Sequence, residues 1–406
     1  MDQYKGAQTI DRHLVISSDC HAGLPPEQYR EYLDREYRET FDAALPIQIE
    51  ETRKAAKKFL VADINEEWRK GHEDGLTGAW DHADRIKVLD GDGCAGEIVF
   101  PDGITEMNMP PFGAGLSLPT EGIAPELQWA GARAHNRWLA EFCSITPERH
   151  AGLAVVPMLW DVDDAVQEVR WAQENGLKGI MIPTQWGALD SYSHDKYDPV
   201  WRECEERSMV LNIHSGAAPM ADYGDGQGMM GSYISEVAFF AARPVTFMIW
   251  GGVFDRFPNL KLMVTEATSI WVPEYLALLD FRYEETPYSA KLGDYTSHLS
   301  LKPSEYFRRN VFLGASCMPR REAEMRHEIG IENLIWGSDY PHPEGTWPFT
   351  KKQMIETFHD IPEDEAAKML GGNAASLFGF DTEKLGEIAA RIGPLKTDFI
   401  TENAGK

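Results

Sequence analysis

The sequence contains the three apolar runs AGLAVVPM (151–158), GIMIPT (179–184) and MVLNIHS (209–215). Each run is rich in β-branched or other apolar residues and ends in a polar or small residue. Residues 163–175 have apolar residues at helical spacing and end before Gly176, and residues 198–208 begin with Asp-Pro, a common helix start. Strands that alternate with helices in this way are typical of α/β proteins with a parallel sheet.

The same alternation extends along the chain. Five further runs have the strand pattern: HLVISSD (13–19), AGEIVFPD (95–102), LKLMVTEA (260–267), NVFLGAS (310–316) and NLIWGSD (333–339). Eight strands with intervening helices predict a (β/α)8 TIM barrel, and the long connections after several strands predict helical insertions at its C-terminal face. We therefore predict one barrel domain over residues 1–385, with an insertion at about 22–94, and a C-terminal tail at 386–406.

Composition limits the partners of this chain. The 406 residues include 39 basic and 65 acidic side chains, for a net charge of -26, which disfavours nucleic acids and anionic membranes as partners. No run approaches the roughly 18 apolar residues of a spanning helix, and the N-terminus does not have the pattern of a signal peptide. The five scattered cysteines suit a reducing compartment. We expect a cytoplasmic protein with a small-molecule substrate.

Imidazoles and carboxylates follow several of the predicted strands. Asp19 and His21 follow the first, His214 the fifth, Glu266 the sixth and Asp339 the eighth. Asp19 and His21 are two residues apart, so both side chains point to the same side of an extended segment. Two imidazoles with several carboxylates suit zinc, manganese or iron. We predict that these residues bind one such ion, or two if Glu266 also serves as a ligand.

Other candidates follow the predicted strands in loops. His342 lies three residues after Asp339, where it could donate to a substrate oxyanion, bind a second metal or only fix the loop. Arg320 could bind a substrate carboxylate through two parallel hydrogen bonds, although a surface role is also open. Trp271 is a candidate wall of the substrate pocket. The loop after the second strand supplies three more polar candidates: Asp102, Glu106 and Asn108.

The chain resembles the amidohydrolase superfamily, in particular the branch that contains aminocarboxymuconate-semialdehyde decarboxylase and the resorcylate-type decarboxylases. The resemblance covers residues 13 to 380 and rests on four motifs: ISSDCHAG (16–23), LNIHSG (211–216), GGVFDRFPNLKLMVTEA (251–267) and WGSDYPHPEGTWP (336–348). It implies that Asp19 and His21 stand for the family's first-strand His-x-His or Glu-x-His, His214 for the fifth-strand His and Asp339 for the eighth-strand Asp. It also implies a homodimer.

Two positions depart from this resemblance. The first ligand is Asp19 instead of His or Glu, and Glu266 stands where the decarboxylases carry a histidine. As a general base, Glu266 would favour hydrolysis of a small carboxylated or cyclic metabolite by metal-activated water, with His214 and Asp339 as the other catalytic groups. This hydrolase is our first expectation.

Two other reactions remain open, and both depend on the role of Glu266. Nonoxidative decarboxylation of a small aromatic or unsaturated acid would need Glu266 as an acid, with a pKa raised toward neutrality. A dinuclear iron oxygenase resembling aminoisobutyrate hydroxylase would use it as a ligand of the second metal. Alternatively, Glu266 only forms an ion pair with Arg256, Arg282 or Arg320.

Overall fold

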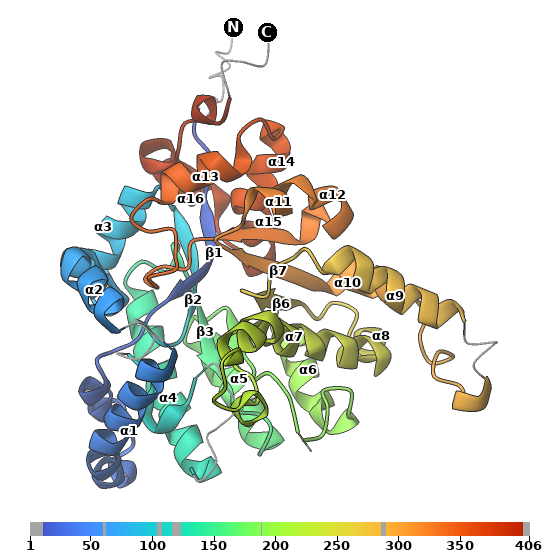
Figure 1. Ribbon diagram of the computed structural model, residues 1–406, viewed down its shortest axis with the longest axis horizontal. Helices are drawn as coiled ribbons and strands as arrows, with labels where there is room; N and C mark the ends of the chain where they lie inside the picture. Colours follow the sequence, from blue (N-terminus) through green and yellow to red (C-terminus); the bar gives the residue numbers. More distant parts are fainter. Residues whose placement is uncertain are drawn as a thin grey trace, which may run out of the picture.

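The structure is a computed structural model that describes residues 11–59, 62–103, 108–115, 123–187, 189–285 and 290–400. Its strands form one parallel sheet in chain order, with the bounds β1 Ile16–His21, β2 Gly96–Phe100, β3 His150–Val155, β4 Gly179–Met181, β5 Val210–His214, β6 Leu262–Thr265, β7 Val311–Ser316 and β8 Leu334–Gly337. The sheet nearly closes, because Cys20 forms a parallel bridge with Tyr340 and the Asp339 N–H donates to the Asp19 carbonyl over 2.8 Å. The predicted (β/α)8 barrel is confirmed (Figure 1).

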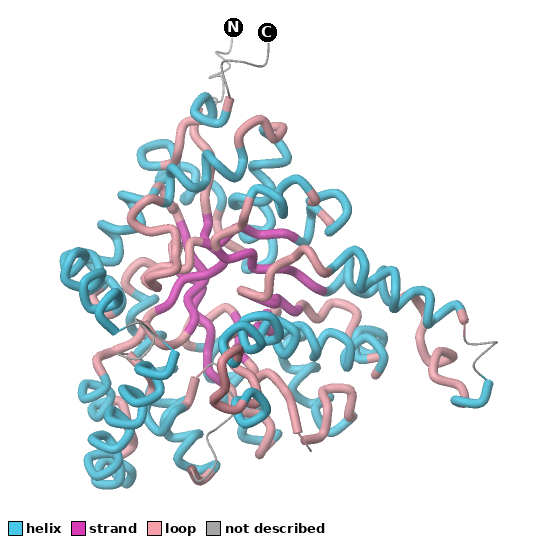
Figure 2. The backbone as a smooth tube through the Cα atoms, in the orientation of Figure 1, coloured by secondary structure: helices cyan, strands magenta, loops and turns pink. Residues whose placement is uncertain are grey.

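Helices surround the strands on all sides (Figure 2). After β2 the helices are α4 Pro125–Ser144, α5 Val162–Glu174, α6 Asp198–Glu206, α7 Met229–Trp250, α8 Val253–Arg256, α9 Val272–Glu284, α10 Pro303–Asn310, α11 Arg320–Glu324, α12 Arg326–Ile329, α13 Thr350–Phe358, α14 Glu363–Ala367, α15 Asn373–Phe378 and α16 Thr382–Ile392. Helix α5 begins at Asp161, which caps its N-terminus, because the Asp161 side chain accepts from the Asp164 N–H and so satisfies one of the free donors of the first turn. The predicted helices at 163–175 and 198–208 correspond to α5 and α6.

The core divides along the strands because successive side chains point to opposite faces. Val15, Val99 and Leu211 belong to the large cluster that includes the surrounding helices, whereas their neighbours Ile16 and Ile98 belong to a second cluster. The second cluster continues into Phe378 of α15 and Leu385 of α16. These last helices therefore pack at the N-terminal end of the barrel and leave the opposite end for the site.

The connection between β1 and β2 is helical, and the insertion at 22–94 stays a prediction. It contains α1 Arg38–Phe59, α2 Ala62–Leu76 and α3 His82–Asp92. At the other end of the chain, α16 crosses the predicted boundary at residue 385, and its Ala389 is buried, as is Phe399 beyond it. The division into a barrel domain and a tail stays a prediction. None of the helices in the described ranges is long and apolar enough to cross a membrane.

Candidate metal centre

The five predicted metal ligands lie together at the C-terminal ends of the strands. Asp19 and His21 belong to β1, His214 is the last residue of β5, Glu266 directly follows β6 and Asp339 lies two residues after β8. All except Glu266 are at most 2% exposed. Residues that are far apart in the sequence meet here because the parallel strands converge.

Backbone carbonyls fix the orientation of both β-strand imidazoles. His21 Nδ1 lies 3.0 Å from the Pro101 carbonyl and 3.1 Å from Asp102 Oδ1, and His214 Nδ1 lies 2.8 Å from the Ser215 carbonyl. A carbonyl oxygen can only accept a hydrogen bond, so Nδ1 carries the hydrogen in each ring. Each Nε2 then faces the centre, where a metal ion can take the place of its proton, which is the usual arrangement of a metal-binding histidine.

The two Nε2 atoms point at one carboxylate. His21 Nε2 and His214 Nε2 each lie 3.3 Å from Asp19 Oδ1, and His21 Nε2 lies 3.5 Å from Asp339 Oδ1. The buried His21 Nε2 has no hydrogen-bond partner, and buried polar atoms are rarely left unsatisfied. The ligand atoms of Asp19, His21 and His214 all lie within 4.8 Å of one another. Nitrogen and carboxylate donors at this spacing fit a divalent transition metal.

Charge pairing dominates the electrostatics of Asp19. Burial alone would raise the pKa of this carboxyl, but the His214 charge and hydrogen bonds from His21 and His214 hold it well below its usual range. For His21, burial opposes the charged form, but hydrogen bonds to Asp102 and Asp19 raise its pKa well above the ordinary value. The centre therefore keeps an ionised carboxylate at its middle, ready to bind a cation.

Glu266 lies at the edge of this centre. Its Oε2 is 3.6 Å from His214 Nδ1, and its side chain is 32% exposed. Desolvation raises the pKa of Glu266 to about 7, and the nearby Asp339 carboxylate adds to the shift. The three arginines considered as its partners bind other residues: Arg256 pairs with Asp198, Arg282 with Glu285 and Arg320 with Glu324. The ion-pair alternative is therefore wrong for these arginines, and Glu266 lies beside His214.

An unusual backbone conformation aims these side chains. Asp102, Glu266, Cys317 and Asp339 follow β2, β6, β7 and β8, and each has a positive φ between 47° and 59°. Residues other than glycine rarely adopt this left-handed region, and such strain concentrates at functional sites. At each of these four strand ends the chain turns sharply, which aims the side chains of Asp102, Glu266 and Asp339 toward the barrel mouth.

Asp102 and His342 extend the centre on its other side. His342 Nδ1 lies 3.0 Å from Asp339 Oδ1, and the His342 ring stacks on His21 with centroids 4.0 Å apart. Burial and the neighbouring His21 lower the pKa of His342, but Asp339 and Asp102 outweigh them and raise it to about 9. Asp102 was only one of several loop candidates, although it ends a strand as the predicted ligands do. The second predicted strand run, AGEIVFPD (95–102), ends in Asp102, and this position at the end of a strand is the sequence signal for it.

Comparison with known proteins places the chain in a family. The sequence profile of the amidohydrolase family matches residues 112–380, about two-thirds of the chain. This chain belongs to the amidohydrolase family. A 2-amino-3-carboxymuconate-6-semialdehyde decarboxylase from Dictyostelium discoideum is 26% identical over 256 residues, which cover 61% of this chain and 66% of that enzyme. A gamma-resorcylate decarboxylase from Rhodococcus jostii is 27% identical over 292 residues, 66% of this chain and 82% of that enzyme.

A solved structure has the same fold. A 5-carboxyvanillate decarboxylase from Novosphingobium aromaticivorans, complexed with manganese and 4-hydroxy-3-methoxy-5-nitrobenzoic acid, superposes with a TM-score of 0.63 at 18% identity, over 93% of this chain and 99% of that one. These relatives are enzymes, which supports the prediction that this amidohydrolase-family chain is also an enzyme. They are decarboxylases, so our first expectation, a hydrolase, is wrong.

Two predicted substrate-binding residues of the amidohydrolase-family chain make other contacts. The Arg320 guanidinium lies 2.9 Å from Glu324 Oε1 and donates to the Thr357 and His359 carbonyls at the end of α13. The last carbonyls of a helix lack intrahelical donors, which explains this arginine, and the structure does not bring it to the centre. The Trp271 indole donates to the Ala267 carbonyl over 3.0 Å, within its own loop. Glu106 lies outside the described residues.

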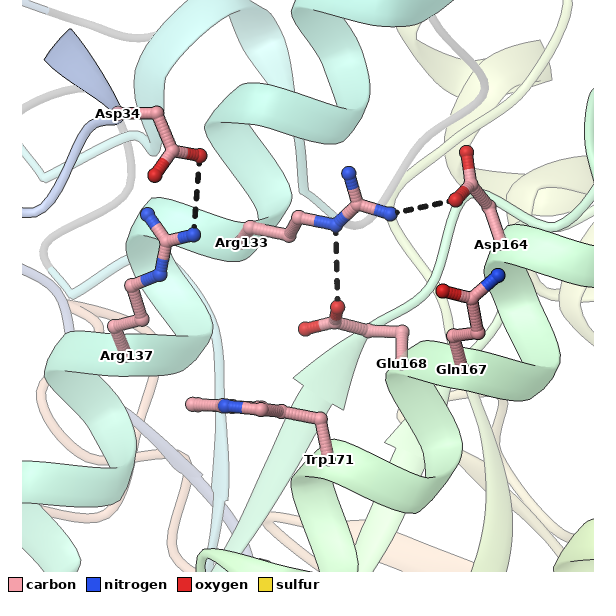
Figure 3. Close-up of a pocket in the computed structure, with 7 residues that line it drawn as sticks. All are labelled: Asp34, Arg133, Arg137, Asp164, Gln167, Glu168 and Trp171. Atoms are coloured by element: carbon pink, nitrogen blue, oxygen red, sulfur yellow. Dashed lines mark hydrogen bonds and ion pairs between the residues drawn. The ribbon is translucent and has the colours of Figure 1, made fainter.

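A cavity of about 420 Å³ lies between α4 and α5 on the outer surface of this amidohydrolase barrel (Figure 3). Arg133 Nη2 lies 2.8 Å from Asp164 Oδ1, and Arg137 Nη2 lies 3.0 Å from Asp34 Oδ2. Each arginine of the cavity is therefore neutralised by a carboxylate.

Proposed function

We propose that this amidohydrolase-family protein is a metal-dependent decarboxylase that removes carbon dioxide nonoxidatively from a small aromatic or unsaturated acid. The observation that carries the proposal is the Glu266 carboxyl group, 3.6 Å from His214 Nδ1, beside a set of donors that fits a divalent ion. The decarboxylase activity of the two curated relatives supports it.

Asp19, His21, His214 and Asp339 would hold the ion. A manganese ion in the carboxyvanillate decarboxylase structure supports a divalent metal of this kind. When bound, the ion supplies a positive charge that attracts the carboxylate and hydroxyl oxygens of the substrate and withdraws electrons from it. Without such a charge, the carboxylates of Asp19 and Asp339 would repel an acidic substrate.

Glu266 supplies the proton that the reaction needs. Decarboxylation breaks one carbon–carbon bond, releases carbon dioxide and leaves an electron pair on the substrate carbon, which takes up one proton. The Glu266 carboxyl is protonated in part of the molecules at neutral pH because its pKa is about 7, so it can donate that proton. Its 32% exposed side chain can then regain a proton from solvent. This role replaces the histidine of the resembled decarboxylases.

Carbon dioxide release tests the proposal. The protein, reconstituted with Mn²⁺, is incubated with a panel of hydroxybenzoic and unsaturated acids labelled with ¹³C in the carboxyl group. We expect ¹³CO₂ from at least one acid and none from the metal-free protein. Absence of ¹³CO₂ from every acid, with one equivalent of metal bound, would contradict the proposal.

A second candidate is oxygenation at a dinuclear iron site, and one observation favours it. His21, Asp102 and His342 form a second group, which shares His21 with the first, and their ligand atoms also lie within 4.8 Å of one another. Metal analysis separates the candidates. One equivalent of manganese or zinc supports decarboxylation, whereas two equivalents of iron with substrate-dependent oxygen consumption support oxygenation. A homodimer with a small-molecule substrate remains part of the proposal.

A further inference from the structure

A buried ion pair joins the insertion to the barrel below the metal centre. Arg85 of α3 and Glu97 of β2 are both 0% exposed. Arg85 Nη2 donates to Glu97 Oε2 over 2.7 Å and Nε donates to Oε1 over 3.0 Å, so the contact is bidentate. His150 Nδ1 of β3 lies 2.9 Å from the same Glu97 Oε1. The Glu97 carboxylate is therefore held from two sides.

The third nitrogen of Arg85 reaches the metal centre itself. Arg85 Nη1 donates to the main-chain carbonyl of His21 over 2.8 Å. The guanidinium also lies over the Tyr340 ring, 4.6 Å from its centroid. Tyr340 directly follows Asp339, and the Tyr340 carbonyl accepts from the His21 N–H over 2.7 Å. One guanidinium thus contacts the main chain of one candidate ligand and the neighbour of another.

Burying the charges of Arg85 and Glu97 costs free energy, so the ion pair must serve a purpose other than stability of the fold. A buried ion pair gains little or no stability over apolar side chains of the same size, because both charges lose their hydration. The planar guanidinium of Arg85 presents several N–H donors in fixed directions, so it can hold the Glu97 carboxylate and the His21 carbonyl at once. A direct benefit of this arrangement is a fixed position for the imidazole of His21, whose Nε2 must meet the ion with little tolerance in distance.

We propose that Arg85 is a positioning residue of the metal centre, which together with Glu97 and Tyr340 holds the main chain at His21 and Asp339 in the geometry that a divalent ion requires. This inference rests on the metal site of the proposed function and on no assumption about the reaction. It predicts that the insertion contributes to metal affinity although none of its helices supplies a ligand to the candidate set.

The test replaces the ion pair by apolar residues and measures metal binding. In the variant Arg85→Met/Glu97→Leu both charges leave together, so no unpaired charge remains buried. We expect a folded barrel by circular dichroism. The Kd for Mn²⁺, from an electron paramagnetic resonance titration, should rise about 10- to 100-fold, which is the usual effect of losing an outer contact of a metal ligand.

Two further variants separate positioning from mere stability. Arg326→Met/Glu365→Leu removes the ion pair of 2.6 Å between α12 and α14, outside the site, and should leave the Kd for Mn²⁺ unchanged. Arg85→Lys keeps the charge but not the fork, so its Kd should also exceed that of the wild type. If the apolar double variant does not fold, the lysine variant decides alone.

The outcomes distinguish this inference from the function beneath it. A wild-type protein that binds no Mn²⁺ would overturn the metal site and, with it, the role of Arg85. A wild type that binds Mn²⁺ tightly, with equal affinity in the folded Arg85 variants, would overturn the positioning role alone. Equal losses of affinity in the Arg85 and Arg326 variants would also overturn it, because the effect would then follow general stability.

Discussion

At the residue scale, a substitution at Glu266 distinguishes two roles of this side chain, proton donor and metal ligand. The substitution Glu266→Gln keeps the shape of the side chain but removes the transferable proton. We expect an unchanged metal content, because four other donors remain, and a kcat lower by about 10²- to 10⁴-fold, as is typical when a proton-transfer group is lost. Elemental analysis and steady-state kinetics of the same preparation measure both. Loss of metal together with activity would instead make Glu266 a ligand.

His214 tests the ligand set itself. The substitution His214→Ala removes one of the two Nε2 donors that face Asp19, so we expect metal content and activity to disappear while circular dichroism still reports a folded barrel. His359→Ala, at a half-buried histidine after α13, is the matched control and should retain both. Full metal occupancy in the His214 variant would remove this histidine from the centre.

At the scale of the elements, a buried carboxyl joins α3 to α13 and makes stability depend on pH. Asp92 Oδ2 accepts from the Thr350 hydroxyl over 2.7 Å, and burial raises the pKa of Asp92 to about 7. The folded protein therefore holds this proton more tightly than the unfolded chain does. Its contribution to stability is complete below pH 4 and is lost as the pH rises through 7, by at most about 1.4 kcal/mol per pH unit.

The substitution Asp92→Asn removes this titration. We expect the Tm of Asp92→Asn, relative to the Tm of the wild type, to be higher at pH 8.5 than at pH 5.5. Calorimetry at both pH values measures this difference. Glu387→Gln, on the exposed side of α16, is the control and should show no such gain. A constant difference in Tm between Asp92→Asn and the wild type at both pH values would show that Asp92 does not titrate as described.

The strands and their terminal residues could be predicted from the sequence, and the contacts of the helices could not. Each apolar run overlaps a strand because burial on both faces leaves a local pattern, and Asp19, His21, His214 and Asp339 meet because parallel strand ends converge. Arg320 also follows a strand, yet its guanidinium binds the end of α13. Arg85 lies in a helix of mixed charge that resembles a solvated surface helix, so its burial against Glu97 leaves no sequence signal.

At the scale of the whole molecule, the net charge of -26 determines the behaviour toward polyanions. We expect no measurable binding to DNA at about 0.15 M salt, because repulsion still acts at contact distance when the Debye length is near 8 Å. A gel-shift titration measures this. A shifted band that weakens as salt is added would contradict the prediction and indicate a basic surface that the overall charge conceals.

The most direct test of the central claim is the mass of the product formed in D₂O by the manganese-loaded protein acting on the acid that releases ¹³CO₂. The account predicts that the carboxyl group is replaced by one deuterium atom and that the product carries no added oxygen, because Glu266 exchanges its proton with solvent before donating it. A product that retains the carboxyl group, or that gains an oxygen atom, would contradict the assignment of this barrel as a nonoxidative decarboxylase.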